Sequence, residues 1–239
     1  MEISSTEAQN NFGRYVKLAQ FEDIIITKNG KKTIVIKSYE APDKNLLTLT
    51  ENAEKYDWKN ENISYHDFLM LSDESEKRYE YINGEVYLLS SPSYNHQNII
   101  MEMSHVLYNW FKGGKCKPLT APFDVTLTVN NNKNVVQPDI IVICDPENID
   151  EKGKYTGIPT IVVEILSEST KQRDMLKKLA LYLYGGIKEY WIVSPLRKEV
   201  YLYYFEEHDI KEYRVYKGLE VVQSLTFEGL EIPLKQIFS

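Results

Sequence analysis

The order of strand-like and helix-like segments predicts an α/β or α+β fold, a sheet flanked by helices and preceded by a small helix–hairpin module. Asn29-Gly30 and Asn83-Gly84 each separate two short strand-like runs, which is a strong local signal for a β-hairpin. Elsewhere, apolar residues at helical spacing alternate with β-branched runs that are typical of strands. Because both kinds of segment recur through most of the chain, we expect helices that pack on a sheet.

Residues 1 to about 40 form a self-contained pattern. Ser4 or Ser5 can cap a helix, and a hairpin follows with strands at 23–27 and 33–36. One helix and one hairpin bury too little surface to be stable alone, so this module is expected to dimerise or to dock on another domain. The apolar positions of the predicted helix are Ala8, Phe12, Tyr15, Val16 and Ala19.

A polar, aperiodic segment at 46–62 predicts a linker between a module at 1–45 and a larger domain at 63–239. In the larger domain, Ser64 begins a short capped helix. Helical spacing returns from Ile99 to Trp110 and from about 170 to 184, and each of these helices ends at a Gly-Gly pair. The predicted strands lie at 79–82, 85–89, 123–129, 135–143, 159–166, 189–193, 199–205 and 212–216.

The composition is that of an ordinary globular protein, with 43% hydrophobic and 26% charged residues. No apolar run approaches the ~20 residues that span a bilayer, and no signal peptide is expected at the start. Cys116 and Cys144 lack metal-ligand spacing, so we expect reduced thiols and a cytoplasmic protein without a membrane partner.

The net charge of −7 is unusual for a nucleic-acid binder, although local clusters of basic residues can set the field at a site. The alternative is that these clusters are only solvated faces. They are Lys28, Lys31 and Lys32; Lys112, Lys115 and Lys117; and Lys171, Arg173, Lys177 and Lys178.

Two carboxylates interrupt apolar runs that are typical of buried strands. Asp139 precedes Ile140–Ile143, and Glu164 follows Ile161–Val163. An ionised carboxylate is costly to bury unless another charge or a metal compensates it. Two such acids on neighbouring strands would repel each other, and a shared cation would remove that repulsion. The pair therefore predicts a divalent-metal site.

Two further groups could belong to this site. Glu80 lies in the second hairpin on the same face as Ile82 and Glu85, where the alternative is an exposed acidic edge. Lys178 either pairs with Asp174, four residues earlier on the same helix face, or points back to the metal site. In the second case its ammonium could position a metal-bound water and offset charge on the attacked phosphate.

The N-terminal module carries three segments, 7–13, 25–31 and 33–36, that resemble the Phd/YefM antitoxin family. This resemblance implies a dimeric module that binds operator DNA through helix and N-terminal residues. The toxin-binding tail of that family is not recognisable in the sequence, and a different domain follows.

The larger domain carries a series of ordered motifs between about 63 and 205. They are Tyr79–Glu85, Ser91-Pro92 with His96-Gln97, Val136–Asp139, Val162–Ser167, Thr170 with Asp174 and Lys178, and Glu189–Val193. In these motifs the domain resembles the Uma-two family, a restriction-endonuclease-like group of the PD-(D/E)xK nuclease superfamily. The resemblance implies a mixed sheet flanked by helices.

The resemblance also implies that Asp139 and Glu164, on adjacent strands, bind Mg²⁺ or Mn²⁺, with Glu80 as a further metal-binding acid. The superfamily motif expects a lysine two residues after Glu164, where this chain has Leu166. Lys178 matches the position to which that lysine has moved in this family. The predicted catalytic residues are therefore Glu80, Asp139, Glu164 and Lys178. The additional site candidates are His96, Gln137 and Asp174, and His96 could instead cap its helix.

Together these residues predict a Mg²⁺-dependent endodeoxyribonuclease of the PD-(D/E)xK type, which hydrolyses DNA phosphodiester bonds. The antitoxin-like arm would form a homodimer or a higher homo-oligomer and place two sites on one duplex. Two alternatives stay open: a non-catalytic DNA-binding regulator on a lapsed nuclease fold, and an enzyme that acts on RNA or another phosphodiester. The sequence has no dinucleotide fingerprint, Walker loop, nucleophile elbow or zinc-type histidine cluster.

Overall fold

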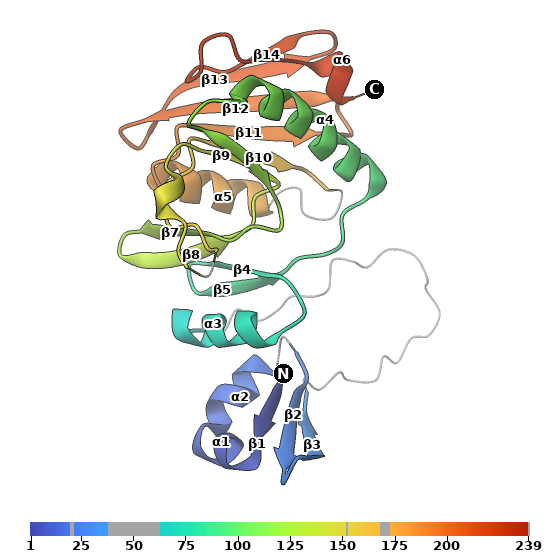
Figure 1. The fold of residues 1–239 in the computed structure, drawn as a ribbon, viewed down its shortest axis with the longest axis vertical. Helices are drawn as coiled ribbons and strands as arrows, with labels where there is room; N and C mark the ends of the chain where they lie inside the picture. Colours follow the sequence, from blue (N-terminus) through green and yellow to red (C-terminus); the bar gives the residue numbers. More distant parts are fainter. Residues whose placement is uncertain (20–21, 38–62, 152, 168–172, 239) are drawn as a thin grey trace. The chain divides into compact units, whose positions relative to one another are not determined.

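The structure, a computed structural model, describes residues 1–19, 22–37, 63–151, 153–167 and 173–238 (Figure 1). The chain divides into two compact units, Met1–Ser90 and Ser91–Ser239. The predicted linker at 46–62 lies outside the described residues, and the predicted domain boundaries remain a prediction. Within the described ranges, no helix is long and apolar enough to cross a membrane.

The first unit begins with a three-stranded sheet of order β1-β2-β3, made of β1 (Glu2–Ser4), β2 (Ile24–Lys28) and β3 (Lys31–Ile36). β2 and β3 form the expected hairpin, and Asn29 and Gly30 in its turn take positive φ values of 52° and 74°. β1, which runs parallel to β2, was not predicted because a strand of three residues shows no clear alternation.

The helix predicted after Ser4 is in fact two short helices, α1 (Ser5–Asn10) and α2 (Phe12–Leu18). The Ser4 side chain caps α1 by accepting a hydrogen bond from the backbone N–H of Glu7. The backbone leaves helical geometry at Asn11, where φ is −131°. The apolar spacing that predicts a single helix continues across this break.

The same unit contains α3 (Tyr65–Glu74), which Ser64 caps, and the hairpin of β4 (Tyr79–Ile82) and β5 (Glu85–Leu88). Asn83 and Gly84 turn this hairpin with φ values of 52° and 90°, as the Asn-Gly signal predicts. Glu80 on β4 is buried, so the alternative of an exposed acidic edge at this residue is wrong.

The second unit is built on a six-stranded mixed sheet of order β13-β12-β11-β10-β9-β6. Its strands are β6 (Lys117–Thr120), β9 (Ile140–Ile143), β10 (Ile161–Ile165), β11 (Glu189–Ser194), β12 (Glu199–Glu206) and β13 (Asp209–Lys217). β10 and β11 pair in parallel, and the other neighbours are antiparallel. A parallel pair needs a crossover connection, and α5 (Arg173–Tyr184) lies in it.

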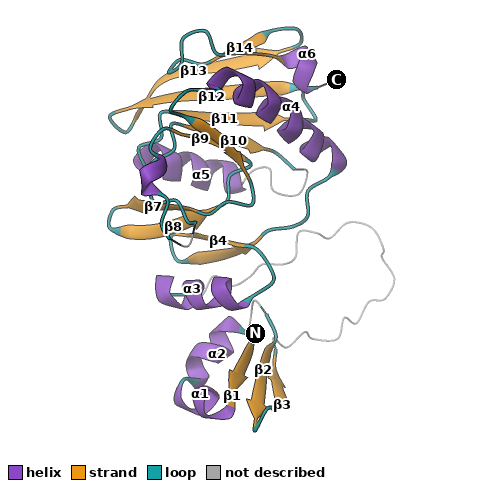
Figure 2. Cartoon of the chain, viewed as in Figure 1, coloured by secondary structure: helices purple, strands orange, loops and turns teal. Residues whose placement is uncertain are grey.

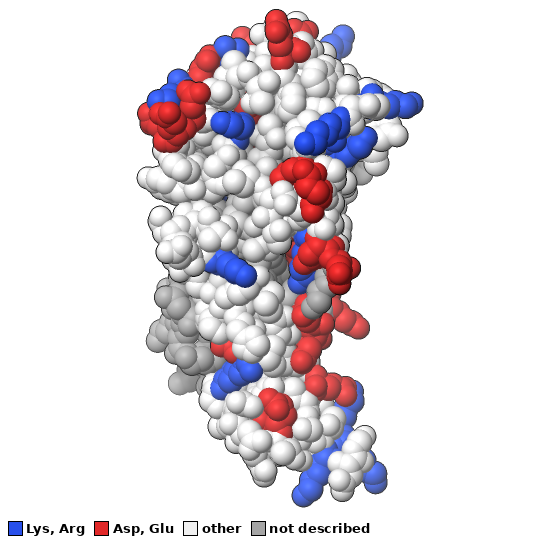
Figure 3. All heavy atoms as spheres, turned by 60° about the vertical axis from the view of Figure 1, so that its left-hand side comes forward, with Lys and Arg blue, Asp and Glu red and all other residues white. Residues whose placement is uncertain are grey.

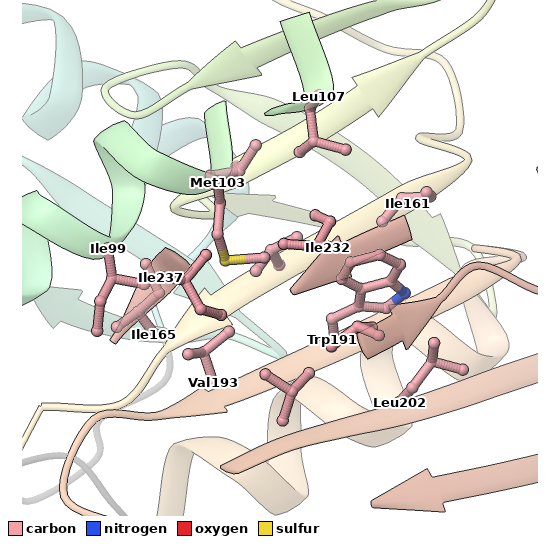
Figure 4. Close-up of a cluster of buried hydrophobic side chains, with 14 of the residues drawn as sticks. Ile99, Met103, Leu107, Ile161, Ile165, Trp191, Val193, Leu202, Ile232 and Ile237 are labelled. Atoms are coloured by element: carbon pink, nitrogen blue, oxygen red, sulfur yellow. The ribbon is translucent and has the colours of Figure 1, made fainter. Parts of the chain in front are cut away.

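Helix α4 (Tyr94–Phe111) covers one face of this sheet. Ile99, Met103 and Leu107 of α4 pack with strand residues such as Ile161 and Trp191 in one hydrophobic cluster (Figure 4). Side chains alternate between the two faces of a strand, so Glu164 and Tyr190 point to the opposite face. Tyr182 of α5 contacts both of them there, which puts α4 and α5 on opposite faces (Figure 2).

The strand predicted at 135–143 is two strands, β8 (Asn132–Val136) and β9, separated by Gln137-Pro138-Asp139. Proline has no backbone N–H to donate to a ladder, and the break falls there. β8 forms a hairpin with β7 (Val125–Val129). The short elements β6, η1 (Pro146–Asn148), β14 (Val221–Gln223), β15 (Glu231–Pro233) and α6 (Leu234–Ile237) were not predicted.

Cys116 and Cys144 are joined by a disulfide, so the expectation of two reduced thiols is wrong. The register pairs Lys117 with Ile143, and the next residues outward, Cys116 and Cys144, lie opposite each other with their Cα atoms 4.0 Å apart. They are 28 residues apart in sequence, and only the strand register brings them together. The cysteines therefore lend no support to the expected cytoplasmic location.

Candidate active site

Asp139 and Glu164 lie at the junction of β9 and β10. Ile140 pairs with Val163 in this antiparallel ladder, and one further step of the same register brings Asp139 opposite Glu164. The backbone N–H of Ile165 donates to Asp139 Oδ2 over 2.7 Å, which ties the two strands together at this point. The Asp139 and Glu164 side chains are 16% and 13% exposed, so both acids are largely but not completely buried.

His96 reaches Asp139 from the first turn of α4. Its Nε2 atom lies 3.1 Å from Asp139 Oδ2. The helix cap is Ser93, whose hydroxyl accepts a hydrogen bond from the backbone N–H of His96 over 3.3 Å. The imidazole of His96 therefore contacts the site, while the capping role belongs to Ser93.

The surroundings of His96 favour its protonated form. Burial lowers the pKa of His96, because an imidazolium loses hydration there. The hydrogen bond to Asp139 and the charge of Asp139 raise it, and Ile165 and Glu164 add to this effect. The net result is a pKa above the ordinary value of 6.5, so an imidazolium paired with the Asp139 carboxylate is favoured.

Helix α5 directs two hydrogen-bond donors at Glu164. Lys178 Nζ lies 3.0 Å from Glu164 Oε1, and the Tyr182 hydroxyl donates to the same oxygen over 2.6 Å. Residues four apart on a helix share a face, so both donors come from the side of α5 that covers the sheet. Lys178 thus reaches Glu164, which is one of the two arrangements left open by the sequence. The side chain of Asp174 lies outside the described residues.

Tyr182 was not among the predicted site residues. Its position four residues after Lys178 predicts a shared helix face, but an aromatic residue at helical spacing fits core packing equally well. Tyr182 is fully buried, and its ring meets that of Tyr190 edge to face with centroids 4.8 Å apart. The contact of its hydroxyl with Glu164 depends on how α5 packs on β10, which no local pattern reports.

Two other predicted site residues have different surroundings. The side-chain amide of Gln137 donates to Asp124 Oδ1 over 2.8 Å, next to the break between β8 and β9. Glu80 lies on β4 in the first unit, so its membership of the site stays a prediction.

Each acid at the junction has its own basic partner: His96 for Asp139 and Lys178 for Glu164. These pairs compensate the buried charges, so burial alone does not demand a shared metal ion. The part of the chain that the structure describes contains no group of three or more His, Cys, Asp or Glu arranged to hold a metal. Mg²⁺, however, often takes only one or two protein carboxylates and keeps water and phosphate oxygens as its other ligands. Asp139 and Glu164 fit that donor set.

Two family models match the chain. The Uma2 family, described as "Putative restriction endonuclease", matches residues 65–235. The family "Antitoxin Phd_YefM, type II toxin-antitoxin system" matches residues 1–54. Both resemblances drawn from the sequence motifs are confirmed by these matches.

Two proteins of Synechocystis sp. (strain ATCC 27184 / PCC 6803 / Kazusa) are similar to this chain. The uncharacterized protein slr1290 is 31% identical over 144 residues, which cover 59% of this chain and 74% of that protein. The uncharacterized protein sll1609 is 22% identical over 130 residues, which cover 54% of this chain and 72% of that protein.

The fold is similar to the crystal structure of a "putative nuclease belonging to DUF820" from Anabaena variabilis ATCC 29413. The TM-score is 0.62 at 24% sequence identity, and the match covers 74% of this chain and 97% of that chain. This likeness confirms the predicted fold class, a mixed sheet flanked by helices. The family match covers most of the chain, and the chain therefore belongs to the Uma2 family, with an N-terminal segment that matches the Phd/YefM antitoxins.

Proposed function

We propose that this protein is a metal-dependent endonuclease that hydrolyses phosphodiester bonds in DNA at the junction of β9 and β10. The observation that carries the proposal is the contact of Lys178 Nζ with Glu164 Oε1, beside Asp139, the residue that precedes the neighbouring strand β9. This lysine comes from α5, and it would supply the cation that a nuclease of this superfamily needs beside its acidic pair. The match to a family described as "Putative restriction endonuclease" supports the same proposal.

Asp139 and Glu164 would hold one Mg²⁺ or Mn²⁺ ion, which, when bound, polarises a phosphoryl oxygen and makes bound water nucleophilic. Lys178 would orient the attacking water and offset the negative charge that develops on the phosphate. His96 would keep the Asp139 carboxylate in place through its hydrogen bond. Glu80 is proposed as a further acid that positions water or a second ion.

The distribution of charge limits where DNA can bind. The net charge is −7, and the face drawn in Figure 3 shows acidic patches between separated basic groups. DNA phosphates are therefore expected to contact separate groups of basic residues and not one continuous basic surface. DNA binding should weaken as the salt concentration rises.

The wild-type protein is expected to nick supercoiled plasmid DNA in Mg²⁺ or Mn²⁺ and to stop when EDTA is added. Removal of the ion would take away the group that polarises the phosphoryl oxygen and activates the attacking water. Agarose-gel analysis of plasmid forms, with activity restored by excess Mn²⁺, measures this directly. DNA binding without cleavage in either metal would favour the non-catalytic regulator, and cleavage confined to RNA would change the substrate.

We further propose that the N-terminal module holds two copies of the chain together. Ile34 and Val35 on β3 are 58% and 53% exposed, and Phe12 and Val16 on α2 are 58% and 42% exposed. In the described part of the first unit, β3 is one of the two edge strands of its sheet. An edge strand with exposed apolar side chains is a surface suited to self-association.

Val35→Glu is expected to convert the dimer to a monomer, because it puts a charge into the proposed apolar contact. Light scattering coupled to size-exclusion chromatography measures the mass of each form. Lys31→Glu is the matched control, since Lys31 is an exposed residue on the same strand and already carries a charge. A wild-type protein that is monomeric, or a Val35→Glu variant that stays dimeric, would rule out this interface.

A further inference from the structure

We infer that Tyr182 is a positioning residue, whose hydroxyl fixes the Glu164 carboxylate in the orientation that binds the metal ion. This inference rests on the metal site of the proposed function. Tyr182 itself touches neither substrate nor metal in this scheme, and it acts through Glu164.

The hydrogen bond between Tyr182 and Glu164 has the geometry of a strong interaction. Its O···O distance is 2.6 Å, within the range of about 2.5–2.7 Å found for hydroxyl donors to ionised carboxylates. Tyr182 is fully buried and the Glu164 side chain is only 13% exposed, so bulk water competes little for this contact.

The donor is held rigidly by its surroundings. The ring of Tyr182 packs edge to face on Tyr190, and α5 fixes the position of its backbone. Lys178, one turn earlier, donates to the same oxygen of Glu164. A lysine side chain has four rotatable carbon bonds, whereas the direction of a packed tyrosine ring is set by two torsions. Of the two donors, Tyr182 is therefore the one that can fix where the carboxylate points.

Loss of this hydroxyl should weaken metal binding more than it weakens the fold. A glutamate with one donor fewer can sample other orientations, and the ion must then order it on binding, at a cost in affinity. Groups that orient a metal ligand typically contribute about 10–100-fold in metal affinity or activity. Phenylalanine keeps the ring and its contact with Tyr190, so the packing of α5 should persist.

The experiment compares Tyr182→Phe with the wild-type protein by isothermal titration calorimetry with Mn²⁺. We expect an affinity lower by about 10–100-fold. The Mn²⁺ concentration that gives half-maximal plasmid nicking should rise by a similar factor. Thermal unfolding followed by circular dichroism, without metal, shows whether the variant is folded. A purely structural role would lower the melting temperature but leave the Mn²⁺ affinity of the folded protein unchanged.

Tyr155→Phe is the matched control. Tyr155 is also fully buried, and its hydroxyl donates to the Asp145 carboxylate over 2.5 Å. The substitution removes the same kind of hydrogen bond from another carboxylate, so Mn²⁺ binding should stay at the wild-type value.

Three results would overturn the inference: wild-type affinity in Tyr182→Phe, an equal loss in both tyrosine variants, or no Mn²⁺ binding by the wild-type protein. A different result separates it from the nuclease proposal. If the wild-type protein binds Mn²⁺ but cleaves no DNA, and Tyr182→Phe alone weakens Mn²⁺ binding, the positioning role holds and the nuclease proposal fails.

Discussion

Replacing Glu164 by glutamine should reduce plasmid cleavage about a thousandfold or more while the protein stays folded. Glutamine has nearly the same shape and keeps an amide oxygen that can accept from Lys178 and Tyr182. It removes the negative charge that would hold the metal ion. Loss of a few kcal/mol of metal-dependent stabilisation corresponds to about three powers of ten in rate, since each ~1.4 kcal/mol is tenfold.

Asp139→Asn should have an effect of the same size. The asparagine oxygen can still accept the backbone N–H of Ile165, so the tie between β9 and β10 should remain. The substitution removes the charge that favours both the metal ion and the protonated form of His96.

Initial rates of plasmid nicking in Mn²⁺, with thermal unfolding as a check on folding, measure both effects. Glu228→Gln is the control, because it makes the same chemical change at an exposed residue between β14 and β15. Cleavage by folded Glu164→Gln or Asp139→Asn at the wild-type rate would show that the chemistry takes place elsewhere in the chain.

Replacing Glu189 by alanine should lower the free energy of unfolding by about 4 kcal/mol, because buried donors would lose their acceptor. Glu189 is fully buried at the start of β11. Its Oε2 accepts from the indole N–H of Trp191 over 2.7 Å, and its Oε1 accepts from the Ser224 hydroxyl over 2.8 Å and from the backbone N–H of Thr226. The carboxylate thus ties the segment before β15 to the central sheet.

Urea unfolding followed by circular dichroism measures this loss. Glu189→Gln should lower the free energy of unfolding by less than Glu189→Ala does, because glutamine keeps one acceptor oxygen. Some loss should remain, since its amide N–H₂ group faces the other donors. Glu206→Ala, at the exposed end of β12, is the control and should change the stability by less than about 0.5 kcal/mol. If Glu189→Ala is as stable as Glu206→Ala, the buried network does not hold this segment.

The parts of the fold that were predicted correctly depend on local interactions. Asn29-Gly30 and Asn83-Gly84 turn where they were expected to, because positive φ at both central residues is a property of the dipeptide itself. The spacing from Ile99 to Leu107 likewise predicts α4, since the residues of one helix face recur with the helical period. β6 and the disulfide were missed because they depend on pairing between segments that are distant in sequence.

The candidate site could be predicted in part. Asp139 and Glu164 were found as acids next to apolar strands, and Lys178 through the family motif. Burial of these two acids does not by itself require a metal ion, because His96 lies against Asp139 and Lys178 pairs with Glu164. The role of Tyr182 and the contact of His96 with Asp139 could not be predicted from the sequence. These side chains come from α4 and α5, which pack on opposite faces of the sheet.

The amino-acid sequence is enough to identify the chemical groups of this protein: two carboxylates beside apolar strand residues, a lysine on the following helix, and the motifs of the Uma2 and antitoxin families. Which of these groups lie in contact depends on the tertiary structure. Lys178 pairs with Glu164 because α5 packs on β10. Cys116 lies opposite Cys144 because of the register between β6 and β9. Helix and strand periods are local properties of the chain, whereas strand registers and the docking of helices follow from the packing of the whole core.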